Sequence, residues 1–514
     1  MKKTNVKHSL ATGLLSLMAL NAANTHAAEA LWTDVAQKTE LNAVENLNVL
    51  ASKHRLVSAN MANLERQLYD RTINQYEMML PLPNGTSALF RLTYAPVYQS
   101  GLAQKYPSIR TFTGYQVDKP ANAGRFDITP QGFHGMFTVD GQRVYIDPLQ
   151  RGNNATYISY YKKDANPLSQ PLTDQVIQSV DSFAGQGDSK AASAQKLGET
   201  KKTYRIAVAA SGEYTAFHGG TKELGQAAIV TMMNRVNEVY EVDLSVTLVL
   251  VDNNDTVVYT DASTDPFDNT SNDIDANITV MSNNIGNDNF DIGHVVNTAG
   301  GGLAGLGVVC GSSKAAGVTG SPAPTNDPFV IDFVAHEIGH QFGGNHPYNG
   351  QTGSCTTAGD SHAYEPGSGS TIMAYAGICG EQDLQDHSDA YFHVHSLDEM
   401  RSFIDTATCS VNTNLNNETP VANAGNDYTI PGSSPFKLTG SATDADGDDL
   451  TYGWEEFDLG TRSSSRAEMV DDGSRPLFRS WTPTSSPVRH LPRLSDIIGK
   501  TSVIGETYAT TDRT

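Results

Sequence analysis

The segment HEIGHQFGGNH, residues 336 to 346, contains three histidines and one glutamate at a spacing that suits a zinc ion. On a helix His336 and His340 lie one turn apart on the same face, so both imidazoles can reach one metal. Gly343 can adopt a positive φ, which lets the chain leave the helix and bring His346 round as a third ligand. Three protein ligands are typical of catalytic rather than structural zinc sites, because they leave one position for water.

Glu337 points into the same cleft but is too close in sequence to the ligands to be one of them. Zinc lowers the pKa of a bound water to about 7, and a carboxylate beside it can act as general base. The pattern therefore predicts metal-assisted hydrolysis. A chance HExxH on a polar helix is the alternative, which the additional Gly343 and His346 make much less favourable.

A second segment, GSGSTIMAYAG at residues 367 to 377, follows His346 after about twenty residues, the usual gap before a Met-turn. Together with HExxHxxGxxH, this turn makes residues 336 to 375 similar to the metzincin zinc endopeptidases. Within that clan the region most resembles secreted bacterial relatives of the reprolysin (adamalysin) family. The resemblance implies that the three histidines bind zinc, that Glu337 is the base and that Met373 forms a hydrophobic floor.

Two residues depart from the reprolysin pattern. Pro347 follows the third histidine, where animal reprolysins have aspartate, and this is closer to the serralysin pattern. Tyr375 matches a tyrosine that in serralysins and astacins can approach the zinc and stabilise the oxyanion. Simple packing of Tyr375 is the alternative, since a phenol near a metal is as easily a structural hydrogen-bond donor.

Elements that would position the motif begin near Tyr204. Strand-like and helix-like stretches alternate there, which favours a mixed sheet under helices, with the helix of residues 329 to 342 below it. The resemblance implies that residues 302 to 310 are the edge strand along which an extended peptide substrate lies. The predicted fold is thus an α/β (α+β) metzincin catalytic domain at 201–412. His294 and His362 are predicted to be structural or surface groups.

The N-terminus carries lysines, a short apolar stretch and small residues, which is typical of a secretory signal peptide over residues 1–27. No later stretch is long and apolar enough to span a membrane. The formal net charge of −22 argues against a nucleic-acid partner. The sequence therefore predicts a secreted, extracellular protein.

Residues 28–200 mix a helical stretch at 44–69 with alternating strands near 134–148, which predicts a separate α+β unit. Its position resembles the propeptide of secreted metallopeptidases, which would make the protein a zymogen; a free-standing binding domain is the alternative. Without cysteine, this unit would have to block the zinc through a carboxylate or a backbone segment. The polar stretch 181–203 is predicted to be a linker and processing region.

Four cysteines in an exported chain predict two disulfides, and three pairings are possible. We favour Cys310 with Cys409, similar to a reprolysin bridge, and Cys355 with Cys379. A thiolate zinc site is the competing use, but CxxC spacing is absent.

Residues 418–514 resemble PKD-like and immunoglobulin-like modules, which predicts an incomplete all-β sandwich that binds a cell-surface or matrix ligand. Calcium is a possible second ion, either at Asp444, Asp446 and Asp448 or in the Asp/Asn-rich stretch 252 to 291. An acidic turn and solvated loops, respectively, are the favoured interpretations.

Together these features predict a secreted zinc endopeptidase with protein or peptide substrates. The alternatives are a non-catalytic surface-binding protein on the same fold, and an amidase or peptidase with one narrow substrate.

Overall fold

The computed structural model describes residues 30–36, 41, 44–166, 174–177 and 198–513 of the 514-residue chain, with 174–177 described by backbone only. The predicted signal peptide and most of the predicted linker at 181–203 lie outside the described residues. Within the described part of the chain, no helix is long and apolar enough to cross a membrane.

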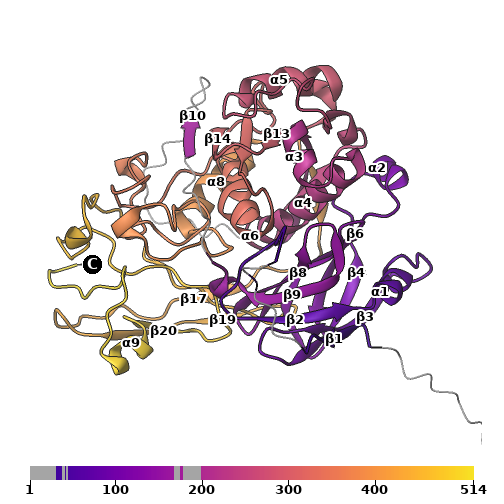
Figure 1. The fold of residues 1–514 in the computed structure, drawn as a ribbon. Helices are drawn as coiled ribbons and strands as arrows, with labels where there is room; N and C mark the ends of the chain where they lie inside the picture. The colour runs from indigo at the N-terminus through magenta and orange to yellow at the C-terminus, as the bar shows by residue number, and fades with distance from the viewer. Residues whose placement is uncertain (1–29, 37–40, 42–43, 167–173, 178–197, 514) are drawn as a thin grey trace, which may run out of the picture. The chain divides into compact units, whose positions relative to one another are not determined.

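Residues 31–166, here called the N-terminal unit, form a nine-stranded antiparallel sheet in the order β1-β2-β9-β8-β7-β6-β5-β4-β3 (Figure 1). Its strands are β1 (Trp32–Asp34), β2 (His54–Ala59), β3 (Gln75–Pro81), β4 (Ser87–Tyr94), β5 (Arg110–Gln116), β6 (Lys119–Thr129), β7 (Gly132–Val139), β8 (Gln142–Gln150) and β9 (Asn153–Tyr161). Its helices are α1 (Met61–Leu68), α2 (Ser100–Lys105) and the 3-10 turn η2 (Lys162–Asp164).

The alternating strands predicted near 134–148 are confirmed as β7 and β8, which pair as a hairpin. Asp140 and Gly141 join them with φ values of 49° and 74°, the left-handed geometry that tight hairpins use. The helix predicted over 44–69 is wrong in its first part: HRLVSA forms β2, paired with β9, and only Met61–Leu68 is helical. The pairing with β9 supplies a long-range partner that overrides local helical preference.

The second sheet has seven strands, ordered β10-β14-β15-β13-β11-β12, with β16 also paired to β11. Strands β11, β12, β13 and β15 run parallel and β14 and β16 antiparallel to them, so the predicted mixed sheet is confirmed. The strands are β10 (Asp174–Ile177), β11 (Thr200–Ala210), β12 (Val246–Leu250), β13 (Ile292–Asn297), β14 (Gly301–Gly305), β15 (Gly317–Gly320) and β16 (Val411–Asn414). Helical segments accompanying this sheet are α3 (Gly212–Phe217), α4 (Lys222–Leu244), η3 (Asn254–Val257), α5 (Asp273–Asn284), η4 (Asn287–Asn289), α6 (Asn326–Phe329), η5 (Val330–Ala335), α7 (His336–Gln341), η6 (Asp360–His362), η7 (Gly380–Gln382) and α8 (Val394–Thr406).

The predicted edge strand over 302–310 is too long. Strand β14 ends at Gly305, and Gly307 turns the chain with a φ of 64° so that the amide of Val308 reaches the carbonyl of Gln341. The outer edge of β14 is paired with β10, which runs parallel to it (Figure 1). A segment that precedes β11 in the chain therefore occupies the edge predicted to receive substrate.

The Asp/Asn-rich stretch 252–291 is not simply a run of solvated loops, because it contains helix α5. Asp273 at the start of this helix is buried, and its carboxylate accepts hydrogen bonds from the Asp268 amide and the Asn297 side chain. Among the described residues of this stretch, no three carboxylates converge as a metal site would require. Part of the acidic composition therefore serves local structure.

The N-terminal unit and α4 share one hydrophobic core, which includes Tyr145 and Tyr160 from the unit and Met232 from the helix. Charged contacts cross the same boundary. The Asp147 carboxylate accepts a hydrogen bond from buried Arg235, and Arg125 Nε lies 3.1 Å from Glu241 Oε2. The N-terminal unit is therefore held against α4 by both apolar packing and ion pairs.

The C-terminal segment, residues 418–513, has little regular structure. It holds two two-stranded sheets, β17 with β19 and β18 with β20, so the predicted sandwich is not confirmed. Its elements are β17 (Val421–Asn423), β18 (Phe436–Thr439), β19 (Ser441–Thr443), η8 (Arg466–Glu468), β20 (Val488–Leu491) and α9 (Leu494–Gly499). Part of it packs on the loop that follows the motif helix, where Arg462 donates hydrogen bonds to the carbonyls of Asn349, Gly350 and Cys355.

The predicted acidic turn is present at Asp444, whose carboxylate accepts the amides of Asp446 and Asp448 at 2.9 and 3.2 Å. These hydrogen bonds are typical of an aspartate-led turn, and calcium there stays a prediction.

Both favoured disulfides, Cys310–Cys409 and Cys355–Cys379, are present in the structure. The first joins the turn after β14 to the chain after α8. The second joins the loop after His346 to the chain just after the Met-turn segment.

Candidate active site

The helix that carries the motif is continuous but not uniform. It begins as α6, passes through the π-helical turn η5, and continues as α7. Single π-helical turns inside a helix are frequently found at functional sites. Gly343 ends the helix with a φ of 94°, as predicted, and the chain returns to place His346 beside the other two histidines.

The three imidazoles converge through their Nε2 atoms. Nε2 of His340 lies 3.0 Å from Nε2 of His336 and 3.0 Å from Nε2 of His346, and the remaining pair is 3.2 Å apart. Two ligand nitrogens at about 2.1 Å from a tetrahedral zinc ion are separated by roughly this distance. The three predicted ligands therefore form a triangle that could hold a metal ion.

The hydrogen-bond partner of each Nδ1 atom determines which protonation state the ring has at the Nε2 atom that faces the other histidines. Nδ1 of His336 lies 2.6 Å from the Ile372 carbonyl oxygen, and Nδ1 of His340 lies 2.6 Å from that of Gly344. A carbonyl only accepts hydrogen bonds, so each Nδ1 carries the proton and each Nε2 presents a lone pair. Lone pairs facing one another at 3.0 Å repel, and a cation between them removes that repulsion. The donor set thus fits zinc.

Glu337 is fully buried on the same helix, and β14 packs directly against its carboxylate. A Cβ atom added to Gly302 would lie only 1.7 Å from Oε1 of Glu337, so any larger residue in this position would displace the carboxylate. Sequence reasoning did not single out Gly302; the only signal was the glycine-rich run at 300 to 307. Because residue 302 is a glycine, the edge strand can pack directly against the predicted base, Glu337.

The Met-turn lies beneath the same helix. A Cβ on Gly339 would lie 2.4 Å from the sulfur of Met373, so the methionine packs against the turn of helix between the two helical histidines. The ring of Tyr375 lies 4.6 Å from that of His346 and 5.7 Å from that of His336, centroid to centroid. Tyr375 therefore lies close to two of the three predicted zinc ligands. Its role as a donor to the oxyanion stays a prediction.

Of the two extra histidines, His294 is structural as predicted: it is buried between Gln341 and Thr319, and burial lowers its pKa to about 4. His362 is different, because the structure brings it to His395 and Glu399.

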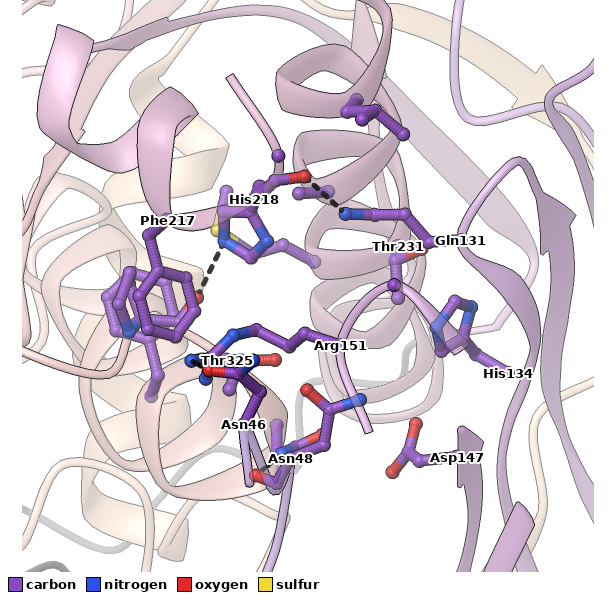
Figure 2. A pocket seen from close by; sticks show the side chains of 18 of the residues that line it. Asn46, Asn48, Gln131, His134, Asp147, Arg151, Phe217, His218, Thr231 and Thr325 are labelled. Atoms are coloured by element: carbon purple, nitrogen blue, oxygen red, sulfur yellow. Dashed lines mark hydrogen bonds between the residues drawn. The ribbon is translucent and has the colours of Figure 1, made fainter. Parts of the chain in front are cut away.

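A cavity of about 640 Å³ lies elsewhere, where the N-terminal unit meets α3, α4 and α6. Figure 2 shows His134 and Asp147 on one side of it and Phe217 on the other, and the Arg151 guanidinium lies 4.0 Å from the centre of the Phe217 ring. None of the three motif histidines lines this cavity.

Glu365 lies just before the Met-turn segment and binds its first residues. Its buried carboxylate accepts the Ser370 amide at 3.0 Å and the Thr371 hydroxyl at 2.6 Å. Burial raises the pKa of Glu365 from 4.5 to about 7. The folded protein therefore retains this proton at a pH where the unfolded chain has lost it.

We expect this shift to make folding stability fall as pH rises. The contribution of Glu365 is fully present below pH 4.5, decreases as pH rises through about 7, and totals on the order of 3 kcal/mol. Glu365→Gln should flatten that part of the pH profile in urea unfolding at pH 5 and pH 8. Exposed Glu65→Gln is the matched control, and equal pH slopes for wild type and Glu365→Gln would contradict the assignment.

Sequence comparison matches residues 200–402 to the family described as Metallo-peptidase family M12B Reprolysin-like. No curated protein shows significant similarity to the chain. Among solved structures, metalloproteinase-II from Bacteroides fragilis aligns with a TM-score of 0.39 and 9% identity, covering 67% of this chain and 95% of that one. The matched region contains the three histidines, Glu337 and the Met-turn, so residues 200–402 form a reprolysin-like M12B metallopeptidase domain.

Proposed function

We propose that the protein is a secreted zinc-dependent endopeptidase made as a zymogen. The observation that carries the zinc assignment is the triangle of Nε2 atoms, with Nδ1 of His336 and His340 each committed to a carbonyl. The family match of residues 200–402 supports peptide hydrolysis as the reaction. Two disulfides support folding in an oxidising compartment and hence export.

In this proposal His336, His340 and His346 hold zinc, which supplies an electrophile and an acidified water when bound. Glu337 accepts the proton of the attacking water and returns it to the leaving amine. Its burial against Gly302 excludes bulk water and fixes the carboxylate before substrate arrives. Tyr375 is assigned to the oxyanion as a hydroxyl donor.

An extended protein or peptide substrate would bind along β14, because an exposed strand edge offers backbone hydrogen bonds to a further strand. In the full chain that edge is already occupied by β10, with the backbone of Asp174 in register with Gly302, the glycine against which Glu337 packs. This pairing supports latency through a backbone segment, one of the two ways of blocking the zinc that are open to a unit without cysteine.

Chelation tests the proposed function. Fully processed protein should hydrolyse unfolded casein, lose at least about nine-tenths of this activity on treatment with a zinc chelator, and regain it on addition of Zn²⁺. Regain with Zn²⁺ but not Mg²⁺ separates metal loss from denaturation. Absence of any cleavage by zinc-loaded, processed protein would favour the non-catalytic alternative or a single narrow substrate.

Latency is tested by breaking the pairing of β10. Proline removes the backbone N–H that a strand ladder needs, so the double change Gln175→Pro and Val176→Pro should weaken the β10–β14 pair. We expect the unprocessed chain to cleave a quenched fluorescent peptide several-fold faster than unprocessed wild type. The matched control is the double alanine variant, which keeps the N–H groups. Identical initial rates for proline and alanine variants, with processing excluded by gel, would contradict latency through β10.

A further inference from the structure

A second group of metal-binding side chains lies outside the proposed active site and is formed by His362, His395 and Glu399. His395 and Glu399 are one turn apart on α8, and His362 comes from η6 in the loop before the Met-turn. The arrangement repeats that of the motif, in which two ligands share a helical face and a third comes from a separate turn. Their side chains are 23%, 12% and 16% exposed, respectively.

The three ligand atoms form a triangle of nearly the same size as the Nε2 triangle of the motif. Nδ1 of His362 lies 3.1 Å from Nε2 of His395, and the two nitrogens lie 2.9 and 3.4 Å from Oε1 of Glu399. Two imidazole nitrogens and one carboxylate oxygen form a donor set that suits zinc and leaves a position for solvent.

Hydrogen bonding alone leaves each arrangement of this triangle with one unfavourable contact. If both facing nitrogens carry protons, both can donate to Oε1 of Glu399, but the two donor nitrogens then lie only 3.1 Å apart. If one donates to the other, the acceptor nitrogen presents its lone pair to that partner and has no proton for Glu399, so its contact with Oε1 is between two acceptors. A cation at the centre makes all three contacts favourable at once.

Neighbouring groups hold the three side chains in place, as expected around a metal site. Asn345 donates its backbone N–H to Oε2 of Glu399 at 2.8 Å and its side-chain amide to Oε1 at 2.9 Å. The Tyr364 ring stacks on His395 at 4.1 Å, and Phe457 of the C-terminal segment stacks on Tyr364 at 5.0 Å.

We propose that His362, His395 and Glu399 bind a second Zn²⁺ ion, separate from the one held by the motif. This ion would join α8 to the loop between His346 and the Met-turn. Through Asn345 it would also fix the backbone next to His346, and through Tyr364 and Phe457 it would anchor the C-terminal segment. The role is structural, and the site does not depend on the protein being a peptidase.

Metal content of the full chain tests this proposal, in a Glu337→Gln background that limits self-digestion. After dialysis against low-zinc buffer, mass spectrometry of the metal should give about two zinc ions per chain. His395→Ala should leave one, His340→Ala should leave one, and the variant with both changes should leave none. His490→Ala, a histidine outside both groups, is the matched control and should retain two.

The His340→Ala variant keeps the test decisive if His395→Ala does not fold, because it leaves the second site untouched. It should bind one Zn²⁺, and removing that ion should lower its thermal midpoint. One zinc per chain in the Glu337→Gln protein, lost completely in His340→Ala, would overturn the proposal. Two zinc ions retained in folded His395→Ala would also overturn it.

Discussion

Glu337→Gln is expected to reduce kcat for peptide hydrolysis by about 10²- to 10⁴-fold while leaving bound zinc unchanged. Glutamine is nearly isosteric with glutamate and would occupy the same space against Gly302, but its amide cannot accept a proton from water at neutral pH. The three histidines and their carbonyl partners are untouched by this change. Loss of rate without loss of metal is therefore the expected pattern.

Steady-state kinetics on a fluorescent peptide, with metal content measured on the same sample, would check this result. The control is Glu65→Gln, which makes the same substitution at an exposed residue. Gln382→Glu would not be a suitable control, because Gln382 is buried. Glu337→Gln with more than about one-tenth of wild-type kcat would rule out Glu337 as the general base.

Asp147→Ala is expected to destabilise the unprocessed chain by about 3–5 kcal/mol, because it leaves the buried guanidinium of Arg235 without its carboxylate. Both side chains are at most 3% exposed, so the ion pair is shielded from bulk solvent in the folded protein. Such a loss is a large fraction of the 5–15 kcal/mol typical of folded domains.

The double variant Asp147→Leu with Arg235→Met should be less destabilised than Asp147→Ala, since it removes both charges together. Asp34→Ala, which breaks an exposed pair with Arg55 in the same unit, should cost under about 1 kcal/mol. Urea unfolding in the Glu337→Gln background measures all three. Equal losses for Asp147→Ala and Asp34→Ala would show that the ion pair does not hold the N-terminal unit to α4.

The parts of the fold that the sequence predicted are those set by local pattern. The helix of residues 329 to 342, the turn at Gly343 and the convergence of the three histidines depend on spacings of three to six residues. The hairpin of β7 and β8 depends on alternation and on Asp140–Gly141. Local spacing and turn chemistry were enough for these elements.

Features that depend on distant contacts were missed. Residues 54–59 are predicted to be helical from their local pattern. The strand is missed because its partner, β9, lies about a hundred residues later in the chain. His362 is predicted to be a structural or surface group, because nothing in its sequence neighbourhood indicates that α8 brings His395 and Glu399 to it. The pairing of β10 with β14, and the packing of Arg462 on the loop at 349–355, likewise depend on the whole tertiary structure.

The Cys310–Cys409 disulfide closes a covalent ring around all of the residues proposed to bind zinc or transfer protons. The three motif histidines, Glu337, the Met-turn and the second cluster all fall between these two cysteines in the chain. A peptidase is exposed to its own activity, and a single self-inflicted cut inside this ring would leave the two pieces linked. The N-terminal unit lies outside the ring, so a cut between residues 178 and 197 breaks its covalent link to the catalytic region. Under the proposed latency, a cut upstream of Cys310 would separate the N-terminal unit from the covalent ring, whereas a cut between the two cysteines would leave both pieces joined.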